Sequence, residues 1–266
     1  GEGARVTAAD VINGGARWAT LVGDVRETLR GVPDGCAQTC VTSPPYFGLR
    51  DYGNAAQIGQ ETTPREFVDA LVAVMRDVRR VLADDGTLWL NIGDSYSQQG
   101  NGYKPKDLLG IPWRLAFALQ DDGWYLRSDI IWAKPNPMPE SVTDRPTRAH
   151  EYVFLLTKRS RYFYDADAIK EPSVMKPQNR LTARAEHPKG DTGRSMHLRP
   201  EGGTSYNSRN ARSVWNVPTD SFGGAHFATM PPELARRCIL AGSRRGDVVL
   251  DPFGGAGTTA LAALQH

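Results

Sequence analysis

The stretch VVLDPFGGAGTT, residues 248–259, indicates the fold, because a short apolar run is followed by a glycine-rich turn and a polar helix start. The run from Val248 to Leu250 predicts a buried strand, and the helix should begin near Thr258. Glycines let a ligand approach the backbone closely, and the helix start offers free N–H groups to a carboxylate or phosphate. The dinucleotide fingerprint G-x-G-x-x-G is not matched and the lysine of a P-loop is missing, although a nucleotide-phosphate loop remains an alternative.

A second stretch, Thr42-Ser43-Pro44-Pro45-Tyr46, follows the apolar run from Ala37 to Val41 and ends it with two prolines. Two prolines cannot continue a central strand, and they fix φ where the chain leaves the sheet. The result is a rigid turn with outward carbonyl groups and an aromatic ring behind them. Such a turn suits a planar amine on a nucleobase, because its oxygens accept the N–H bonds and the ring holds the base by its π face. A proline-capped strand end is the plain structural alternative.

Taken together and in this order, TSPPY and DPFGGAGTT resemble the motifs of the permuted, β-class bacterial DNA amino-methyltransferases. The resemblance implies the α/β fold of S-adenosylmethionine-dependent methyltransferases, circularly permuted, with a mostly parallel seven-stranded sheet and helices on both faces. It also implies a catalytic part at residues 1–169, an inserted target-recognition segment at 170–213 and a cofactor-binding part at 214–266. The implied cofactor is S-adenosylmethionine, and the implied substrate is double-stranded DNA.

The same resemblance assigns roles to single residues. The implied catalytic residues, which would hold the target amine and its base, are Ser43, Pro44, Pro45 and Tyr46. The implied cofactor-binding residues are Asp24, Ser43, Phe227, Thr229, Asp251, Pro252, Phe253, Gly255, Gly257, Thr258 and Thr259. In this scheme Asp24 accepts from the adenine amino group, and Phe227 and Thr229 line the methionine end. The plain alternative for Asp24 is a cap on the helix that follows it.

The candidate DNA contacts are Arg50, Lys104, Lys106, Lys134, Asn136, Arg180, Arg184, Arg194, Arg199 and Arg209. The first three lie in polar, glycine-rich segments, for which a solvated or disordered loop is the alternative. Lys134 and Asn136 belong to a Trp-x-Lys-Pro-Asn turn that lies beside the target-base pocket in the resembling family. The remaining five lie in the segment 170–213, whose basic character is described next.

Segment 170–213 has nine Lys and Arg residues against four Asp and Glu, a local net charge of +5, whereas the whole chain carries only +2. The rest of the chain is therefore net acidic. Such asymmetry favours a polyanionic partner, and arginine forks suit guanine edges and phosphates. A disordered basic linker is the competing interpretation.

Composition predicts one globular α/β domain with an insert, since 266 residues with 40% hydrophobic and 23% charged side chains are ordinary for such a protein. No apolar run approaches the roughly 20 residues of a membrane helix, and residues 1–10 do not resemble a signal peptide because they have no long apolar core. The three cysteines are odd in number and lack metal-ligand spacing. We therefore expect a reduced cytoplasmic setting and no metal site, with Cys36 and Cys40 as small core residues.

The intervening pattern predicts alternating helices and strands. A short strand at 18–24 precedes a helix at 26–30, and Thr63-Pro64-Arg65-Glu66 caps a helix that an acidic turn at 84–86 joins to a strand at 87–92. A helix at 108–119, opened by Asp107 or by Pro112, is followed by antiparallel strands at 124–134 and 151–157. Order resumes at 214–217, before a helix from 232 to 240 with Gly242 just after its end.

The reaction implied by the resemblance is direct methyl transfer to the exocyclic amine of a flipped base, N6 of adenine or N4 of cytosine, with that choice left open. The alternatives are an RNA or protein-glutamine amino-methyltransferase, or a non-catalytic DNA-binding subunit. A homodimer and a cognate restriction endonuclease are candidate partners, and an orphan regulatory role is the other setting. The family continues beyond the final helix with a strand ending in a ribose-binding acid, so we expect residues beyond His266.

Overall fold

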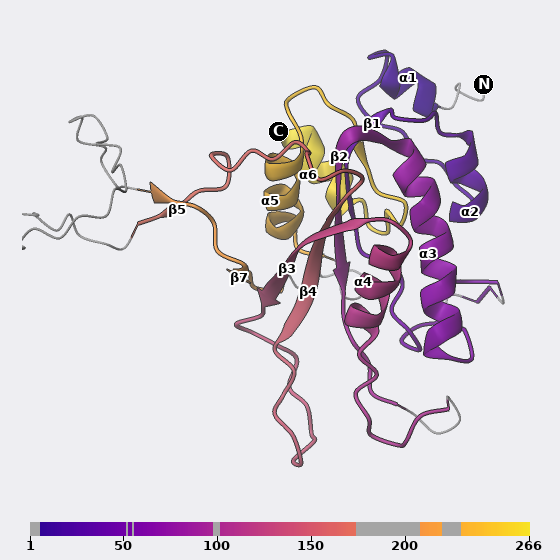
Figure 1. The fold of residues 1–266 in the computed structure, drawn as a ribbon, viewed down its shortest axis with the longest axis vertical. Coiled ribbons are helices and arrows are strands. Elements are labelled where there is room, and N and C mark those ends of the chain that lie inside the picture. The colour runs from indigo at the N-terminus through magenta and orange to yellow at the C-terminus, as the bar shows by residue number, and fades with distance from the viewer. Residues whose placement is uncertain (1–5, 52, 55, 98–101, 174–207, 220–229) are drawn as a thin grey trace, which may run out of the picture.

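The computed structural model describes residues 6–51, 53–54, 56–97, 102–173, 208–219 and 230–266. Its main sheet has the strand order β7-β3-β4-β2-β1-β8 (Figure 1). The strands are β1 (Ala37–Thr42), β2 (Leu82–Ile92), β3 (Tyr125–Ala133), β4 (His150–Thr157), β7 (Val214–Asn216) and β8 (Val249–Leu250). Five of them run in one direction and only β4 runs against them. The sheet is mostly parallel as expected, but its described part has six strands rather than seven.

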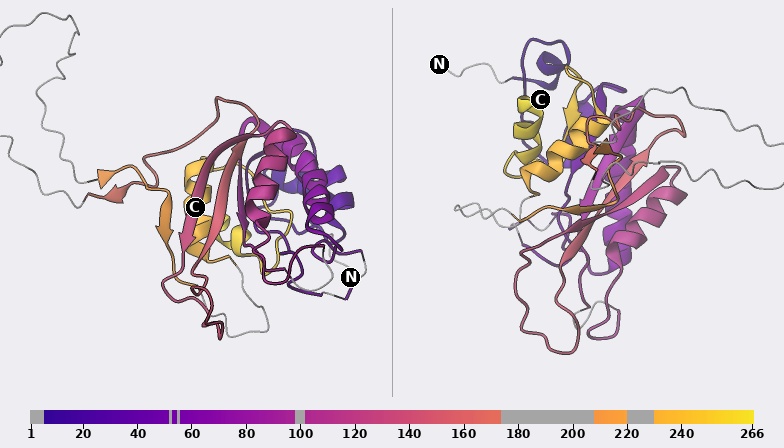
Figure 2. Two further views of the ribbon diagram at one scale, coloured as in Figure 1. Left: turned by 60° about the horizontal axis from the view of Figure 1, so that its bottom comes forward. Right: turned by 90° about the vertical axis from the view of Figure 1, so that its left-hand side faces the viewer.

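Helices cover both faces of this sheet, which confirms the expected α/β architecture (Figure 2). One face carries α3 (Pro64–Val81) and α4 (Ile111–Asp121), and the other carries α5 (Pro232–Gly242) and α6 (Thr258–Gln265). The chain begins with the short helices α1 (Ala8–Ile12) and α2 (Val25–Thr28) and the 3-10 turn η1 (Leu29–Gly31). Each face has its own cluster of buried side chains, so the central strands are covered on both sides.

The unit β1-α3-β2 is the parallel βαβ unit that the sequence predicts. Thr63 and Glu66 form a capping box at the start of α3, where Pro64 takes the first helical position. The predicted turn at 84–86 is wrong as a boundary, because β2 already begins at Leu82. Residues 83–86 instead form an irregular stretch of the strand, between the pairs Ala37 with Leu82 and Thr39 with Thr87.

Of the remaining elements, α4 begins at Ile111 with Pro112 as its second residue. Of the two residues predicted to open this helix, Pro112 is therefore right and Asp107 is wrong. The antiparallel pairing of β3 with β4 is confirmed. The strand predicted at 18–24 is wrong, because that segment has no hydrogen-bonded neighbour in the described sheet, whose edge is β8. Trp18 and Val22 are accordingly 57% and 86% exposed.

Gly242 has a different role from the predicted helix terminator, because it is the last helical residue of α5 and packs directly on the sheet. A methyl group on it would lie 2.6 Å from the hydroxyls of Thr39 and Thr87 and 2.7 Å from Trp89 Nε1. Glycine is therefore needed here for the close approach of α5 to β1 and β2.

The basic insert starts and ends at a small two-stranded sheet, β5 (Glu171–Pro172) with β6 (Ser208–Arg209). Glu171 accepts from Arg212 Nε at 2.9 Å and lies 3.3 Å from Arg209 Nη2. The two ends of the segment 170–213 are thereby joined at its base, while residues 174–207 lie outside the described part.

The cysteines expected in the core are found there: Cys40 is fully buried, and Cys36 packs against the core from its edge. Burial raises the pKa of the Cys40 thiol, which keeps it protonated. Within the described residues, no helix combines the length and hydropathy that crossing a membrane requires.

Candidate active site

The two stretches singled out from the sequence lie side by side in the structure, because β1 and β8 are parallel neighbours with Cys40 paired to Leu250. Both turns therefore leave the same edge of the sheet, where ligands bind in open α/β folds. A side-chain bond joins them: Thr42 Oγ1 donates to Asp251 Oδ1 at 2.6 Å. A cavity of about 1810 Å³ opens at this edge, and both turns line it.

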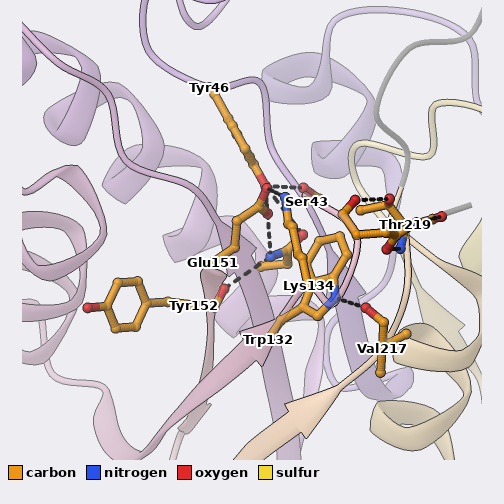
Figure 3. Close-up of polar contacts among 10 residues, drawn as sticks. Ser43, Tyr46, Trp132, Lys134, Glu151, Tyr152, Val217 and Thr219 are labelled. Carbon is orange, nitrogen blue, oxygen red and sulfur yellow. Dashed lines mark hydrogen bonds and ion pairs between the residues drawn. The ribbon is translucent and has the colours of Figure 1, made fainter. Parts of the chain in front are cut away.

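The proline turn is held by side chains. The hydroxyl of Tyr46 donates to Glu151 Oε2 at 2.5 Å, and Ser43 Oγ lies 3.5 Å from the same hydroxyl (Figure 3). A Cβ on Gly93 would lie 2.6 Å from Cε2 of Tyr46, so the ring packs against bare backbone at the end of β2. Burial and the adjacent Glu151 carboxylate raise the pKa of Tyr46 well above its usual value, which keeps the phenol protonated.

Glu151 is the centre of a polar cluster that the sequence analysis missed. Its carboxylate accepts from Tyr46, from Asn91 Nδ2 at 3.1 Å and from Lys134 Nζ (Figure 3). The Lys134 ammonium also lies 4.4 Å from the centre of the Trp132 ring. The signal was present, because Glu151 is the one acidic residue in the otherwise apolar strand EYVFLLT. Its strand runs antiparallel to β2, so the start of β4 meets the end of β2 at the site.

The glycine turn between β8 and α6 is held mainly by backbone conformation. Gly255 and Gly257 have φ values of +47° and +79°, and Gly257 caps the N-terminus of α6. Asp251 accepts from the backbone N–H of Phe253 at 3.1 Å as well as from Thr42. Burial raises the pKa of the Asp251 carboxyl. The turn thus presents backbone to the cavity, with the first N–H groups of α6 free to bind a polar ligand.

The glycine turn is the part of the site that the sequence predicts to hold S-adenosylmethionine. The cavity that the turn lines gives a ligand access to its backbone. Few side chain atoms stand at this turn, because Gly254 and Gly255 have no side chain and Ala256 has only a methyl group. All three residues are exposed. Methyl groups built on Gly254, Gly255 and Gly257 would meet no atom closer than 3.7 Å. The space directly beside these glycines is therefore open.

Asp24, predicted to contact the cofactor, caps α2 by accepting from Arg26 N, and its carboxylate pairs with the Arg26 guanidinium at 2.5 Å. That hydrogen-bonded pair lowers the pKa of Asp24 to about 2. The plain expectation of a helix cap is confirmed. The carboxylate does not line the cavity, although its neighbour Gly23 does.

The predicted DNA contacts fall into three groups. Arg50 lines the cavity, and Lys104 is exposed in the loop at 102–107. Those bonded within the protein are Lys106 to Asp144, Lys134 to Glu151, Asn136 to Thr219 and Arg209 to Glu171. The third group, Arg180, Arg184, Arg194 and Arg199, lies outside the described residues, as do the predicted cofactor contacts Phe227 and Thr229.

The structure has an α/β fold of the methyltransferase type, in which the glycine turn and the Ser-Pro-Pro-Tyr turn line one cavity. The model of the DNA methylase family, which covers N6 and N4 methyltransferases, matches residues 37–266. The chain belongs to this family and is an S-adenosylmethionine-dependent DNA amino-methyltransferase.

One curated relative and two solved structures show how similar the chain is to individual methyltransferases. Type II methyltransferase M.SmaI of Serratia marcescens is 49% identical over 267 residues, which cover 92% of this chain and 82% of the relative. The solved PvuII DNA methyltransferase (cytosine-N4-specific) matches 93% of this chain and 78% of its own with a TM-score of 0.66, at 19% identity. A putative DNA modification methylase from Thermus thermophilus, solved with S-adenosyl-L-methionine, matches 91% of this chain and 81% of its own, with a TM-score of 0.56 and 28% identity.

Proposed function

We propose that the protein methylates the exocyclic amine of a base flipped out of double-stranded DNA, N6 of adenine or N4 of cytosine, at the Ser43-Pro44-Pro45-Tyr46 turn. The observation that carries this proposal is the pairing of β1 with β8, which sets this turn against the glycine turn on one cavity. The two candidate amines each present two N–H donors on a planar ring, so one set of acceptors serves either.

In the proposed mechanism Ser43 Oγ and the Pro44 carbonyl accept the two N–H bonds of the amine. A base amine is a weak nucleophile, because its lone pair is conjugated with the ring. Acceptors held outside the ring plane favour a pyramidal nitrogen with a localised lone pair, and fixed positioning of this kind lowers the barrier. The glycine turn would hold S-adenosylmethionine, which would supply an electrophilic methyl group and leave as S-adenosylhomocysteine, while the methylated amine would release one proton to solvent. The proposed role of Tyr46 is to hold the flipped base by its ring face.

For the cofactor we propose that the turn at residues 251–257 and the start of α6 carry the binding. Backbone N–H groups there suit the carboxylate of the methionine end. The proposed contribution of Asp251 is indirect, because its carboxylate is engaged by Thr42 and by the backbone of Phe253. The assignments of Asp24, Phe227 and Thr229 to the cofactor remain predictions.

For DNA we propose that residues 170–213 form the target-recognition segment between the two parts of the methyltransferase domain, residues 1–169 and 214–266. The local charge of +5 supports this role. The joined base at β5 and β6 supports an insert whose ends emerge together. Of the described candidates, Arg50 is the one that lines the cavity, so it is our choice for a phosphate beside the flipped base.

We further propose that the protein acts beside a restriction endonuclease of the same specificity, since M.SmaI is a Type II methyltransferase. A homodimer is the second proposed assembly. Light scattering at several protein concentrations, with and without duplex DNA, tests the dimer directly.

The decisive experiment incubates the protein with duplex DNA and labelled S-adenosylmethionine, digests the DNA and identifies the methylated nucleoside by mass spectrometry. We expect N6-methyladenine or N4-methylcytosine, and the product decides between them. RNA and total protein serve as parallel substrates. Label in either of these with none in DNA would overturn the proposal.

A further inference from the structure

The hydroxyl of Ser43 differs from a carboxylate at the same position in the hydrogen bonds that it can make. A carboxylate can only accept hydrogen bonds, whereas a serine hydroxyl both donates and accepts. To activate an amine, Ser43 must present a lone pair and point its own hydrogen elsewhere. The direction of that one O–H bond therefore decides whether the turn holds the amine or repels it.

The structure contains a chain of hydroxyl groups that sets this direction. Glu151 accepts only, and its Oε2 lies 2.5 Å from the Tyr46 hydroxyl, so the tyrosine must be the donor. The contact from Tyr46 to Asn91 Oδ1 is longer, at 3.3 Å, and is to a neutral acceptor. With its hydrogen directed at Glu151, the Tyr46 oxygen can accept from Ser43 Oγ, 3.5 Å away. Ser43 then has its lone pairs free.

We propose that Glu151 is a positioning residue that fixes this donor direction, so that Ser43 faces the cavity as a hydrogen-bond acceptor for the target amine. The inference rests on the proposed function, and it adds a residue that does not touch the substrate. The chain runs from the amine to Ser43, from Ser43 to Tyr46 and from Tyr46 to Glu151. Every link donates toward the carboxylate.

Two further contacts keep the Glu151 carboxylate in the role of acceptor. Lys134 pairs with Oε1, and Asn91 Nδ2 donates to Oε2 at 3.1 Å. The side chains of Lys134 and Glu151 are only 18% and 14% exposed, so little water competes for them. Asn91 is itself fixed, because its amide also donates to the Tyr152 carbonyl at 3.1 Å. In this proposal the buried Lys134–Glu151 ion pair keeps the Glu151 carboxylate beside Tyr46 as a hydrogen-bond acceptor.

The test uses Glu151→Gln, which keeps the shape of the side chain and introduces an N–H donor. Lys134 and Asn91 Nδ2 both donate to this side chain, and the charged Lys134 is the stronger donor. Lys134 therefore takes the carbonyl oxygen of the new amide and turns the NH₂ group toward Tyr46. The amide then donates to the Tyr46 oxygen and takes the acceptor position that Ser43 used. We expect single-turnover methylation of duplex DNA to slow by about 10-fold, the size of one lost hydrogen bond. The affinity for S-adenosylmethionine should change little, whereas the melting temperature should fall, because Lys134 loses its ionic partner in a site of low exposure.

The matched variant is Glu151→Gln combined with Lys134→Met. Without the lysine, the amide can turn its carbonyl oxygen to Tyr46 and its NH₂ away, which restores the original direction. We expect the double variant to be faster than Glu151→Gln and close to Lys134→Met alone. Because the double variant also removes the lysine that Glu151→Gln leaves buried without its ionic partner, melting temperatures are measured beside the rates. The rates are then compared at a temperature at which all the variants are fully folded. A double variant as slow as Glu151→Gln, or a single variant as fast as the wild type, would overturn the inference.

Removing a second hydrogen-bonding group, the Tyr46 hydroxyl, keeps the test decisive if Glu151→Gln folds poorly. Tyr46→Phe removes the middle hydroxyl, and adding Glu151→Gln to it should cause no further slowing. Additive losses would contradict a common chain. The proposed function fails separately, because in that case the wild-type protein would not methylate DNA at all.

Discussion

The two turns that line the cavity are built in opposite ways. The turn after β1 is held by side chains that reach across three strands, from Tyr46 to Glu151 on β4 and Asn91 on β2. The turn after β8 is held by glycine conformations and one carboxylate, Asp251. The first arrangement fixes atoms for chemistry, whereas the second clears space and exposes backbone. Substitutions in the first turn should therefore change rate, and substitutions in the second should change stability and binding.

The largest expected effect is that of Ser43→Ala. It removes the acceptor for one amine N–H and leaves the fold intact, because within the described part of the chain the Ser43 hydroxyl bonds to Tyr46 alone, at 3.5 Å. We expect single-turnover methylation to fall by about 100-fold, in line with losing one preorganised polar group at a reacting centre. Cofactor affinity, measured by calorimetry, should stay within about twofold. A wild-type rate in this variant would remove Ser43 from the proposed mechanism.

The second largest effect is expected for Gly93→Ala, which changes the backbone position against which the Tyr46 ring packs. The new methyl group would lie 2.6 Å from the Tyr46 ring and would displace it from Glu151. We expect about a 10-fold slower methyl transfer, because a small displacement at the site is costly. In a Tyr46→Ala background the clash is absent, so Gly93→Ala should lower the melting temperature less there than in the wild type. An equal loss in both backgrounds would place the clash elsewhere.

The difference between the turns also explains what the sequence predicts and what it does not. The proline pair, the capping box at Thr63 and the glycine run are local signals, and each specifies its element without knowledge of the fold. Glu151 is separated from Tyr46 by 105 residues, and only the pairing of β4 with β2 brings it to the site. The strand predicted at 18–24 failed for the converse reason, because strand identity depends on a neighbour that a local pattern cannot supply.

In the glycine turn, Gly257→Ala should have a smaller effect. Gly257 has a φ of +79°, and a side chain in this left-handed region costs about 1 kcal/mol. A methyl group there meets no atom within 4 Å, so the cost is confined to the backbone. We expect a loss of about 1 kcal/mol in the free energy of unfolding, measured by urea titration. Gly31→Ala is the matched control, since its methyl group is also unhindered but its φ is not in that region. Equal losses in both variants would refute the conformational argument.

The smallest effect concerns the one carboxylate that joins the turns. Burial raises the pKa of Asp251 above its ordinary 3.8, so the folded protein holds this proton more tightly than the unfolded chain does. The contribution of the carboxyl to stability is therefore present at low pH and is lost as the pH rises through the folded-state pKa, from about 4 upward. Asp251→Asn keeps the oxygen that Thr42 and Phe253 bond and removes the titration. We expect the wild type to lose stability relative to this variant as the pH rises from about 4 toward 7, measured by urea unfolding at each pH. If stability depended on pH in the same way for both proteins, burial would not disfavour the ionised Asp251 carboxylate in the fold. Other side chains would then have to stabilise that charge in the turn after β8.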